Sequence, residues 1–154
     1  MGEIALVVFC LVSLPGIFRR FGHFNKPVSI VMIFRRQLGI AMYLFAVIHL
    51  AFNWAIPVAA RVFPLFPIPT FAFFGIASAI LLFFLFITSN DLSVNKLGIW
   101  WNRIHSLLYI VLWFVFLHTM LQRVSIWSII IGITAASEVA SFVFAKSRRK
   151  IETS

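Results

Sequence analysis

Charged side chains are scarce in this sequence, and their scarcity excludes most soluble folds. Charged residues fill 11% of the 154 positions and hydrophobic residues fill 62%, whereas soluble domains have about 25% charged residues and about half apolar ones. A chain of this size cannot hide so much apolar surface inside itself, because small domains leave a large share of their surface exposed. The composition therefore predicts an all-α integral membrane protein, whose remaining apolar surface is covered by lipid.

Cysteine and glycine-rich loops are also nearly absent. The single cysteine, Cys10, lies in an apolar stretch, so the chain has no disulfide framework and no CxxC metal site. No glycine-rich dinucleotide fingerprint follows a strand, so we expect that this chain does not itself collect hydride from NAD(P)H. The net charge of +9 is spread between and after the apolar runs rather than along one polar face, which argues against a nucleic-acid partner.

Five apolar runs are candidates for membrane-spanning helices. The first is short, with Pro15 and Gly16 near its end, and we interpret it as a retained helix because no Lys or Arg precedes it and no A-x-A cleavage site follows it. Proline-rich and polar stretches at 57–69 and 89–96 are predicted loops, and 21–34 is predicted to lie along the membrane face as an interfacial segment. The predicted spans are 4–18, 37–56, 71–88, 101–121 and 125–145, in a single domain over 1–154.

The positions of the basic residues predict an orientation. If the N-terminus is outside, eleven of the thirteen Lys and Arg residues fall in cytoplasmic segments. Only Arg61 and Arg123 fall in outer segments. Because basic residues are retained on the cytoplasmic side, the sequence predicts an N-out, C-in topology.

Three of the four histidines lie inside predicted spans, where ionisable side chains are rare. His49 lies 13 residues after Arg36, and His118 lies 13 residues after His105, a rise of about 20 Å in each helix. Because these two spans run in the same direction, both later histidines reach the outer half of the membrane. They are candidates for the two axial ligands of a planar macrocycle such as haem. The alternative is a neutral imidazole that hydrogen-bonds to Ser, Thr or Tyr.

A haem is favoured over a bare metal ion, because a structural zinc site needs four close ligands and these histidines are far apart among large apolar side chains. His105 lies near the inner boundary without an evident second ligand, although His23 is one candidate. A kink or π-bulge would help to align His105 with His118, since 13 residues leave them roughly 140° apart on an ideal helix. Basic residues near the inner boundary are candidates for propionate partners or, equally, for topology determinants: Arg35, Arg36 and Arg103.

One carboxylate, Glu138, lies in the middle of the last predicted span. Its role is open between a protonated helix-packing residue and a contact to another subunit.

One sequence motif lies before His49 and another before His118. The first, Arg-Arg-Gln-Leu-Gly at 35–39, is followed by His49, and the second, Lys-Leu-Gly-Ile-Trp-Trp-Asn-Arg-Ile-His at 96–105, is followed by His118. Together with Thr-Ser-Asn at 88–90, they resemble the ferric reductase-like transmembrane domain over nearly the whole chain. The similarity is greatest to the branch that contains the haem-binding membrane subunit of the periplasmic methionine sulfoxide reductase system.

The resemblance implies a reduced version of a six-helix bundle that binds b-type haem, with the match beginning at the family's second helix. It implies that His49 and His118 bind one haem in the outer half and that His105 binds a second haem on the inner side. NADPH oxidases have two histidines on the helix that matches the second span, whereas this chain has only His49, so the number of haems is open between one and two.

The function implied is that of an electron-transfer subunit of an oxidoreductase. It would take electrons from a cytoplasmic flavin reductase or a quinone and pass them to an outer-side redox protein, in a bacterial inner membrane. The alternative is a small structural subunit of a larger respiratory or photosynthetic complex, with or without haem.

Overall fold

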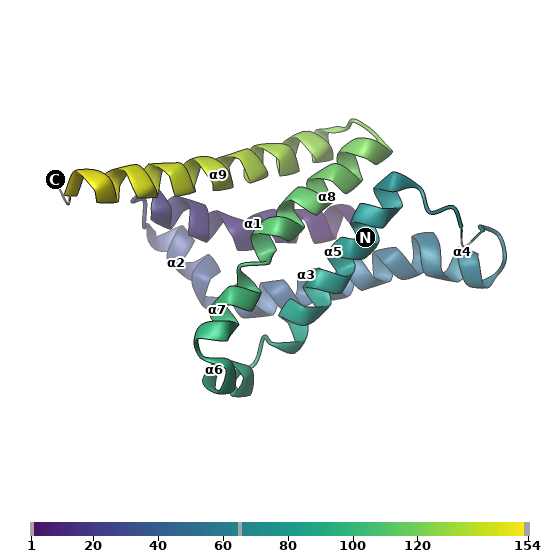
Figure 1. Cartoon of the computed structure of the whole chain (residues 1–154), viewed down its shortest axis with the longest axis horizontal. Helices are drawn as coiled ribbons and strands as arrows, with labels where there is room; N and C mark the ends of the chain where they lie inside the picture. Colours follow the sequence, from purple (N-terminus) through teal and green to yellow (C-terminus); the bar gives the residue numbers. More distant parts are fainter. Residues whose placement is uncertain (1, 65, 153–154) are drawn as a thin grey trace.

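The computed structural model describes residues 2–64 and 66–152, and the secondary structure of these residues is entirely helical (Figure 1). Five helical segments are long and apolar enough to cross a membrane, which confirms the predicted number of spans. Segments of this length cross the hydrocarbon core with all backbone hydrogen bonds satisfied. The five segments are Gly2–Arg20, Arg35–Ala59, Thr70–Ile87, Ile99–Gln122 and Ile126–Arg149.

Two of these segments are interrupted. A π-helical turn separates α3 from α4, and a break at residues 106 and 107 separates α7 from α8. The elements are α1 Gly2–Arg20, α2 Lys26–Ile33, α3 Arg35–Leu50, the π-helical turn Ala51–Ala55, α4 Ile56–Ala59, α5 Thr70–Ile87, α6 Asp91–Leu97, α7 Ile99–His105, α8 Leu108–Gln122 and α9 Ile126–Glu152.

The predicted loop at 89–96 is wrong, because most of it forms helix α6. Its polar composition indicated a loop, but the same residues make a strong helix start. The Asn90 side chain accepts a hydrogen bond from the Ser93 amide at 2.8 Å, and Asp91 lies in the first turn. Both features stabilise a helix N-terminus. The helix ends at Gly98, whose φ of +49° suits a residue without a side chain.

Other boundaries also differ from the prediction. The expected loop at 57–69 begins as helix α4, because Pro57 occupies the first turn of that helix, where its missing N–H does no harm. Helix α1 continues through Pro15 to Arg20, and α9 continues to Glu152. The expected interfacial segment contains the short helix α2, capped by Asn25. Its position along the membrane face stays a prediction.

The spanning helices form a closed ring. Helix α1 packs against α3 and α9, α5 packs against α3 and α8, and α8 packs against α9. Helices α3 and α8 therefore both flank α5. The buried core lies inside it and is formed by apolar side chains from all five segments: Leu6, Phe9, Cys10, Met42, Leu82, Leu85, Leu108, Val111, Leu112, Ile131 and Ala135.

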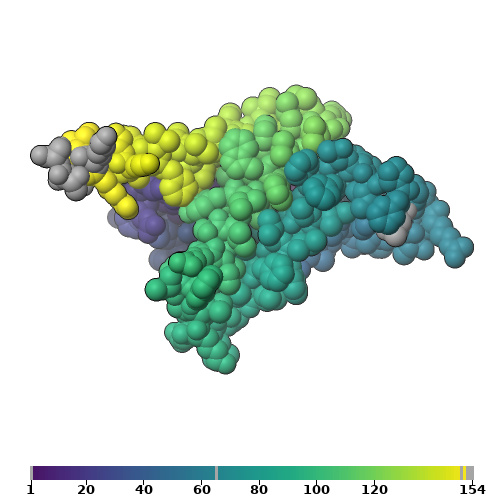
Figure 2. All heavy atoms as spheres, viewed as in Figure 1, coloured from purple at the N-terminus to yellow at the C-terminus, as the bar shows by residue number. Residues whose placement is uncertain are grey.

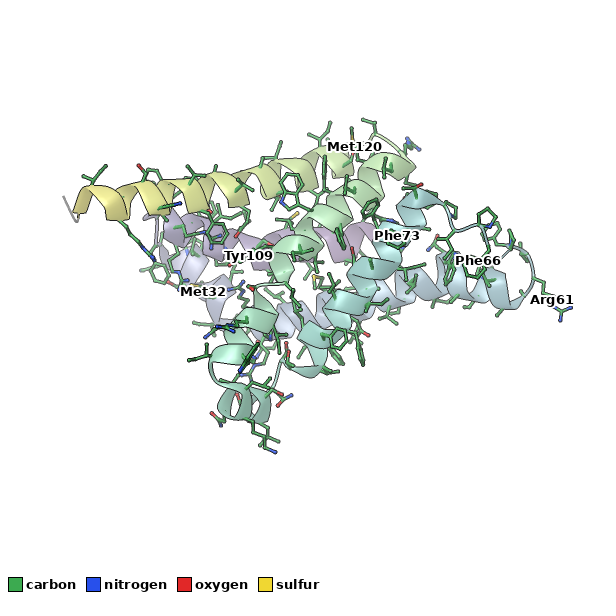
Figure 3. The ribbon with its side chains drawn as sticks, viewed as in Figure 1. Met32, Arg61, Phe66, Phe73, Tyr109 and Met120 are labelled. Carbon is green, nitrogen blue, oxygen red and sulfur yellow. The ribbon has the colours of Figure 1, made fainter. Side chains whose placement is uncertain are left out.

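The two ends of the bundle differ. Arg61 projects at one end, whereas Met32 lies towards the other (Figure 3). The last turns of α9 extend beyond the neighbouring helices, and α6 forms a second projection (Figure 2). Many side chains on the helices are large, apolar and exposed, including Phe73, Phe83 and Ile133, as expected for surfaces that face acyl chains.

Candidate functional site

His49 on α3 and His118 on α8 meet across the ring of helices. Their ring centroids lie 6.4 Å apart, with the ring planes at 80°. Two imidazoles that share one metal ion, with metal–nitrogen bonds of about 2.0–2.1 Å, would place their centroids roughly 6 Å apart. The spacing of these two rings therefore suits a metal held between them. The structure thus brings together the two histidines that the sequence paired.

The imidazole of His118 is held by helix α5. Its Nδ1 lies 2.8 Å from the carbonyl oxygen of Phe71. Because a carbonyl oxygen only accepts, Nδ1 carries the proton and Nε2 keeps a free lone pair for a metal. Gly75 lies one turn after Phe71, and a Cβ at this position would come 2.7 Å from Nδ1. The missing side chain of Gly75 is what allows the ring to reach the Phe71 carbonyl.

The imidazole of His49 is held from both sides. The side-chain amide of Asn53 lies 3.2 Å from Nδ1 and also donates to the His49 carbonyl oxygen at 2.9 Å. On the other side, a Cβ at Gly2 would come 2.8 Å from His49 Cε1. Asn53 belongs to the π-helical turn 51–55, an element that often marks functional sites in helices.

His105 and His23 lie elsewhere. His105 Nε2 is 3.2 Å from the Thr88 hydroxyl, and its ring stacks on Trp101 at a centroid distance of 4.0 Å. His23 is exposed, with Nδ1 3.3 Å from the Phe21 carbonyl oxygen. Among residues 2–64 and 66–152, no hydrogen bond or ring contact joins these two histidines, and no group of three or more His, Cys, Asp and Glu side chains could bind a bare metal ion.

The three candidate arginines are far from the histidine pair. Arg35 precedes His49 by 14 residues on the same helix, or about 21 Å. Arg36 forms an exposed ion pair with Asp91 at 2.6 Å, which holds the pKa of that carboxyl below its usual range. The Arg103 guanidinium lies over the Trp100 ring, 4.7 Å from its centroid.

Glu138 finds its partner inside this chain. It is 3% exposed and forms an ion pair with Arg20. This pair joins α9 to α1, so Glu138 takes part in helix packing as a partner of Arg20. A contact to another subunit stays untested.

Several residues of the site were missed by sequence reasoning. Asn53 had a usable signal, because it follows His49 by four residues and so lies on the same helix face. Gly2 and Gly75 had no such signal, because each lies against a histidine that belongs to another helix than its own.

Comparison with known proteins supports the resemblance. Residues 1–117 match the family described as ferric reductase like transmembrane component. The chain is also similar to the haem-binding subunit MsrQ of protein-methionine-sulfoxide reductase from Brucella anthropi, with 35% identity over 81 residues. That alignment covers 50% of this chain and only 36% of the relative's length. All of α9 lies beyond the segment that matches the family.

Proposed function

The chain belongs to the ferric reductase-like transmembrane component family, and from this membership we propose that it is a haem b-binding electron-transfer subunit. It is a multi-pass membrane protein with five candidate spans, and we place it in a bacterial cell membrane. The relative in Brucella anthropi is named as a haem-binding subunit, which supports the cofactor. A bound haem would supply one-electron redox chemistry.

The facing imidazoles of His49 and His118 carry this proposal. Both rings have their Nδ1 edge engaged, by the Asn53 amide and by the Phe71 carbonyl. In metal-binding histidines, such contacts fix the orientation of the ring and tune the ligand. Nε2 of His118 has no partner among the described residues and is the nitrogen that would bind iron. At His49 the Asn53 amide donates to Nδ1, so the neutral ring carries its proton on Nε2. Binding of iron through this Nε2 would require the proton to move to Nδ1 and the Asn53 side chain to turn its oxygen towards it. His49 and His118 are therefore the residues that would hold a haem, and the haem would supply one-electron chemistry between its two iron oxidation states.

The direction of electron transfer follows from the proposed N-out topology. With this orientation the His49–His118 site lies in the outer half, so electrons would leave towards an outer-side redox protein. The donor would be a cytoplasmic flavin reductase or a quinone. Each of these partners is a proposal drawn from the basic-residue distribution and from family membership.

From the family resemblance we also propose His105 as a ligand of a second, inner haem. Arg35, Arg36 and Arg103 are candidates for its propionate partners and, equally, for topology determinants. In the described residues, the His105 ring lies within hydrogen-bond distance of the Thr88 hydroxyl rather than of a second imidazole. The second haem therefore depends on the family resemblance alone, whereas the first also has support from geometry.

The test is a reduced-minus-oxidised absorption spectrum of purified protein, with a pyridine haemochrome assay for the number of haems per chain. We expect a b-type spectrum, and we expect H49A and H118A each to abolish the outer haem. H23A and H105A serve as matched histidine controls that leave the outer haem intact and change only an inner one. Folded protein without any haem would overturn the proposal and favour a structural subunit of a larger membrane complex.

A further inference from the structure

A polar cavity lies inside the bundle, away from the histidine pair. It measures about 30 Å³ and is lined from α1, α3, α8 and α9 by Ser13, Arg19, Arg20, Arg35, Tyr109 and Glu138. A cavity of this size has room for about two water-sized groups. Three guanidiniums and one carboxylate among its lining residues give it an excess of positive charge. The outer haem site at His49 and His118 does not use this cavity, whose lining contributes only Arg35 as a candidate propionate partner of an inner haem.

Arg20 and Glu138 neutralise each other within the cavity wall. The Arg20 guanidinium forms an ion pair with Glu138 and donates to the Ser141 hydroxyl at 2.8 Å. It also lies 4.1 Å from the centroid of the Phe142 ring, a cation–π contact. The donors and the charge of Arg20 are thus largely satisfied by protein groups. Any further anion in the cavity would have to be bound by another residue.

Arg35 is the guanidinium that remains. It is half-buried and lines the cavity, yet it has no hydrogen-bond or ion-pair partner among residues 2–64 and 66–152. Its neighbour Arg36 has the same charge but points outwards to Asp91. A half-buried guanidinium with five N–H donors requires acceptors. Arg19, which is exposed, adds a second guanidinium at the cavity rim.

We propose that this cavity binds a phosphate group, with Arg35 as its principal ligand and Arg19 at the rim. The planar fork of an arginine matches two phosphate oxygens at once. Basic pockets between transmembrane helices on the cytoplasmic side are suited to lipid headgroups, and the proposed topology puts this end of the bundle on that side. The cavity admits phosphate oxygens rather than a whole headgroup. An anionic phospholipid or free phosphate could therefore supply the group, and this assigns Arg35 a ligand other than a haem propionate.

The test compares R35Q with R36Q, since both remove one charge from adjacent positions and only Arg35 lines the cavity. The full chain is placed in nanodiscs of phosphatidylcholine alone or with phosphatidylglycerol, and thermal unfolding is measured. A second arm titrates inorganic phosphate into protein in a neutral detergent, at constant ionic strength. We expect phosphate or the anionic lipid to stabilise the wild type and R36Q, with an apparent affinity about 10- to 100-fold weaker in R35Q.

The two arms identify the source of the phosphate. Stabilisation in the phosphate titration supports a free anion, and stabilisation by phosphatidylglycerol alone supports a lipid headgroup. Equal responses of R35Q and R36Q, or no response of the wild type to either addition, would overturn the site. A normal lipid response of R35Q with fewer haems per chain would also overturn it, in favour of a propionate partner. R35K, which keeps the charge without the fork, provides a second variant if R35Q does not fold.

Discussion

The substitution G75A tests how closely the His118 ring depends on its surroundings. Gly75 lies on α5, directly against this ring. A Cβ at position 75 would approach Nδ1 to 2.7 Å and Cε1 to 2.9 Å. Both distances are too short for carbon against a ring atom, so the imidazole has to move. Since the ring is anchored by a 2.8 Å hydrogen bond to the Phe71 carbonyl oxygen, movement lengthens or breaks that bond.

Two costs set the magnitude of the effect. A lost hydrogen bond costs about 0.5–1.5 kcal/mol, and an extra methyl group in a packed site costs about 1–3 kcal/mol. If the two costs partly overlap, the haem-bound form is destabilised by about 1–3 kcal/mol, which corresponds to roughly 5- to 150-fold weaker haem binding. Loss of an outer-shell contact to a metal ligand typically weakens binding by about 10- to 100-fold, in the same range.

The assay is haem titration into the purified apo-protein, followed by absorption of the reduced form. G39A is the matched control, because Gly39 lies within α3 and a Cβ there meets nothing within 4 Å. The control should bind haem as the wild type does. If G75A also binds haem with wild-type affinity and an unchanged spectrum, His118 is not held as described, and its assignment as an axial ligand loses its geometric support.

Three further predictions concern other parts of the chain. N53A should weaken haem binding by about 10- to 100-fold in the same titration, because it releases the imidazole that the amide holds. E138A should lower the free energy of unfolding by about 3–5 kcal/mol by leaving the Arg20 charge buried and unpaired, and replacing both residues by Leu should restore most of this loss in an unfolding measurement. Because Arg36 lowers the pKa of the Asp91 carboxyl, that pair stabilises the protein above the unfolded pKa of about 3.9 and stops doing so as the pH falls through the lower folded pKa. NMR titration of this carboxyl should show a pKa that returns to its usual range in R36Q.

Hydropathy was sufficient for the number of spans but not for their ends. The five apolar runs are all helices, because a lipid-exposed backbone must satisfy its own hydrogen bonds. The segment 89–96 was misassigned because a polar sequence suits both a loop and a short capped helix, and the capping contact of Asn90 decides between them. The predicted ends of α1 and α9 came too early because each was set where basic residues begin, and basic residues are tolerated in helices that reach the membrane surface.

The depth of the histidines was also readable from the sequence. His49 and His118 each follow an inner-boundary residue by 13 positions on helices that run in parallel, and the structure brings their rings together. Depth depends only on the rise per residue, which is nearly constant in a helix. The contacts that hold these rings were not readable in the same way. Gly75 lies 43 positions from His118, and no local pattern indicates that their helices touch.

For the arginines, the sequence predicted the depth of each side chain but not its direction around the helix axis. Arg35 and Arg36 were treated alike, as two charges of equal depth, because their spacing from the apolar run differs by one residue. A turn of about 100° per residue sends adjacent side chains to different faces. One of them lines the internal cavity, and the other meets Asp91 outside the bundle. Which face of α3 is internal depends on where α1, α8 and α9 lie. Helix α9 supplies Glu138, which lies 118 residues after its partner Arg20 in the sequence. The groups that Arg35 can bind are therefore determined by how the helices pack around the cavity. Residue type and depth in the membrane do not predict this packing.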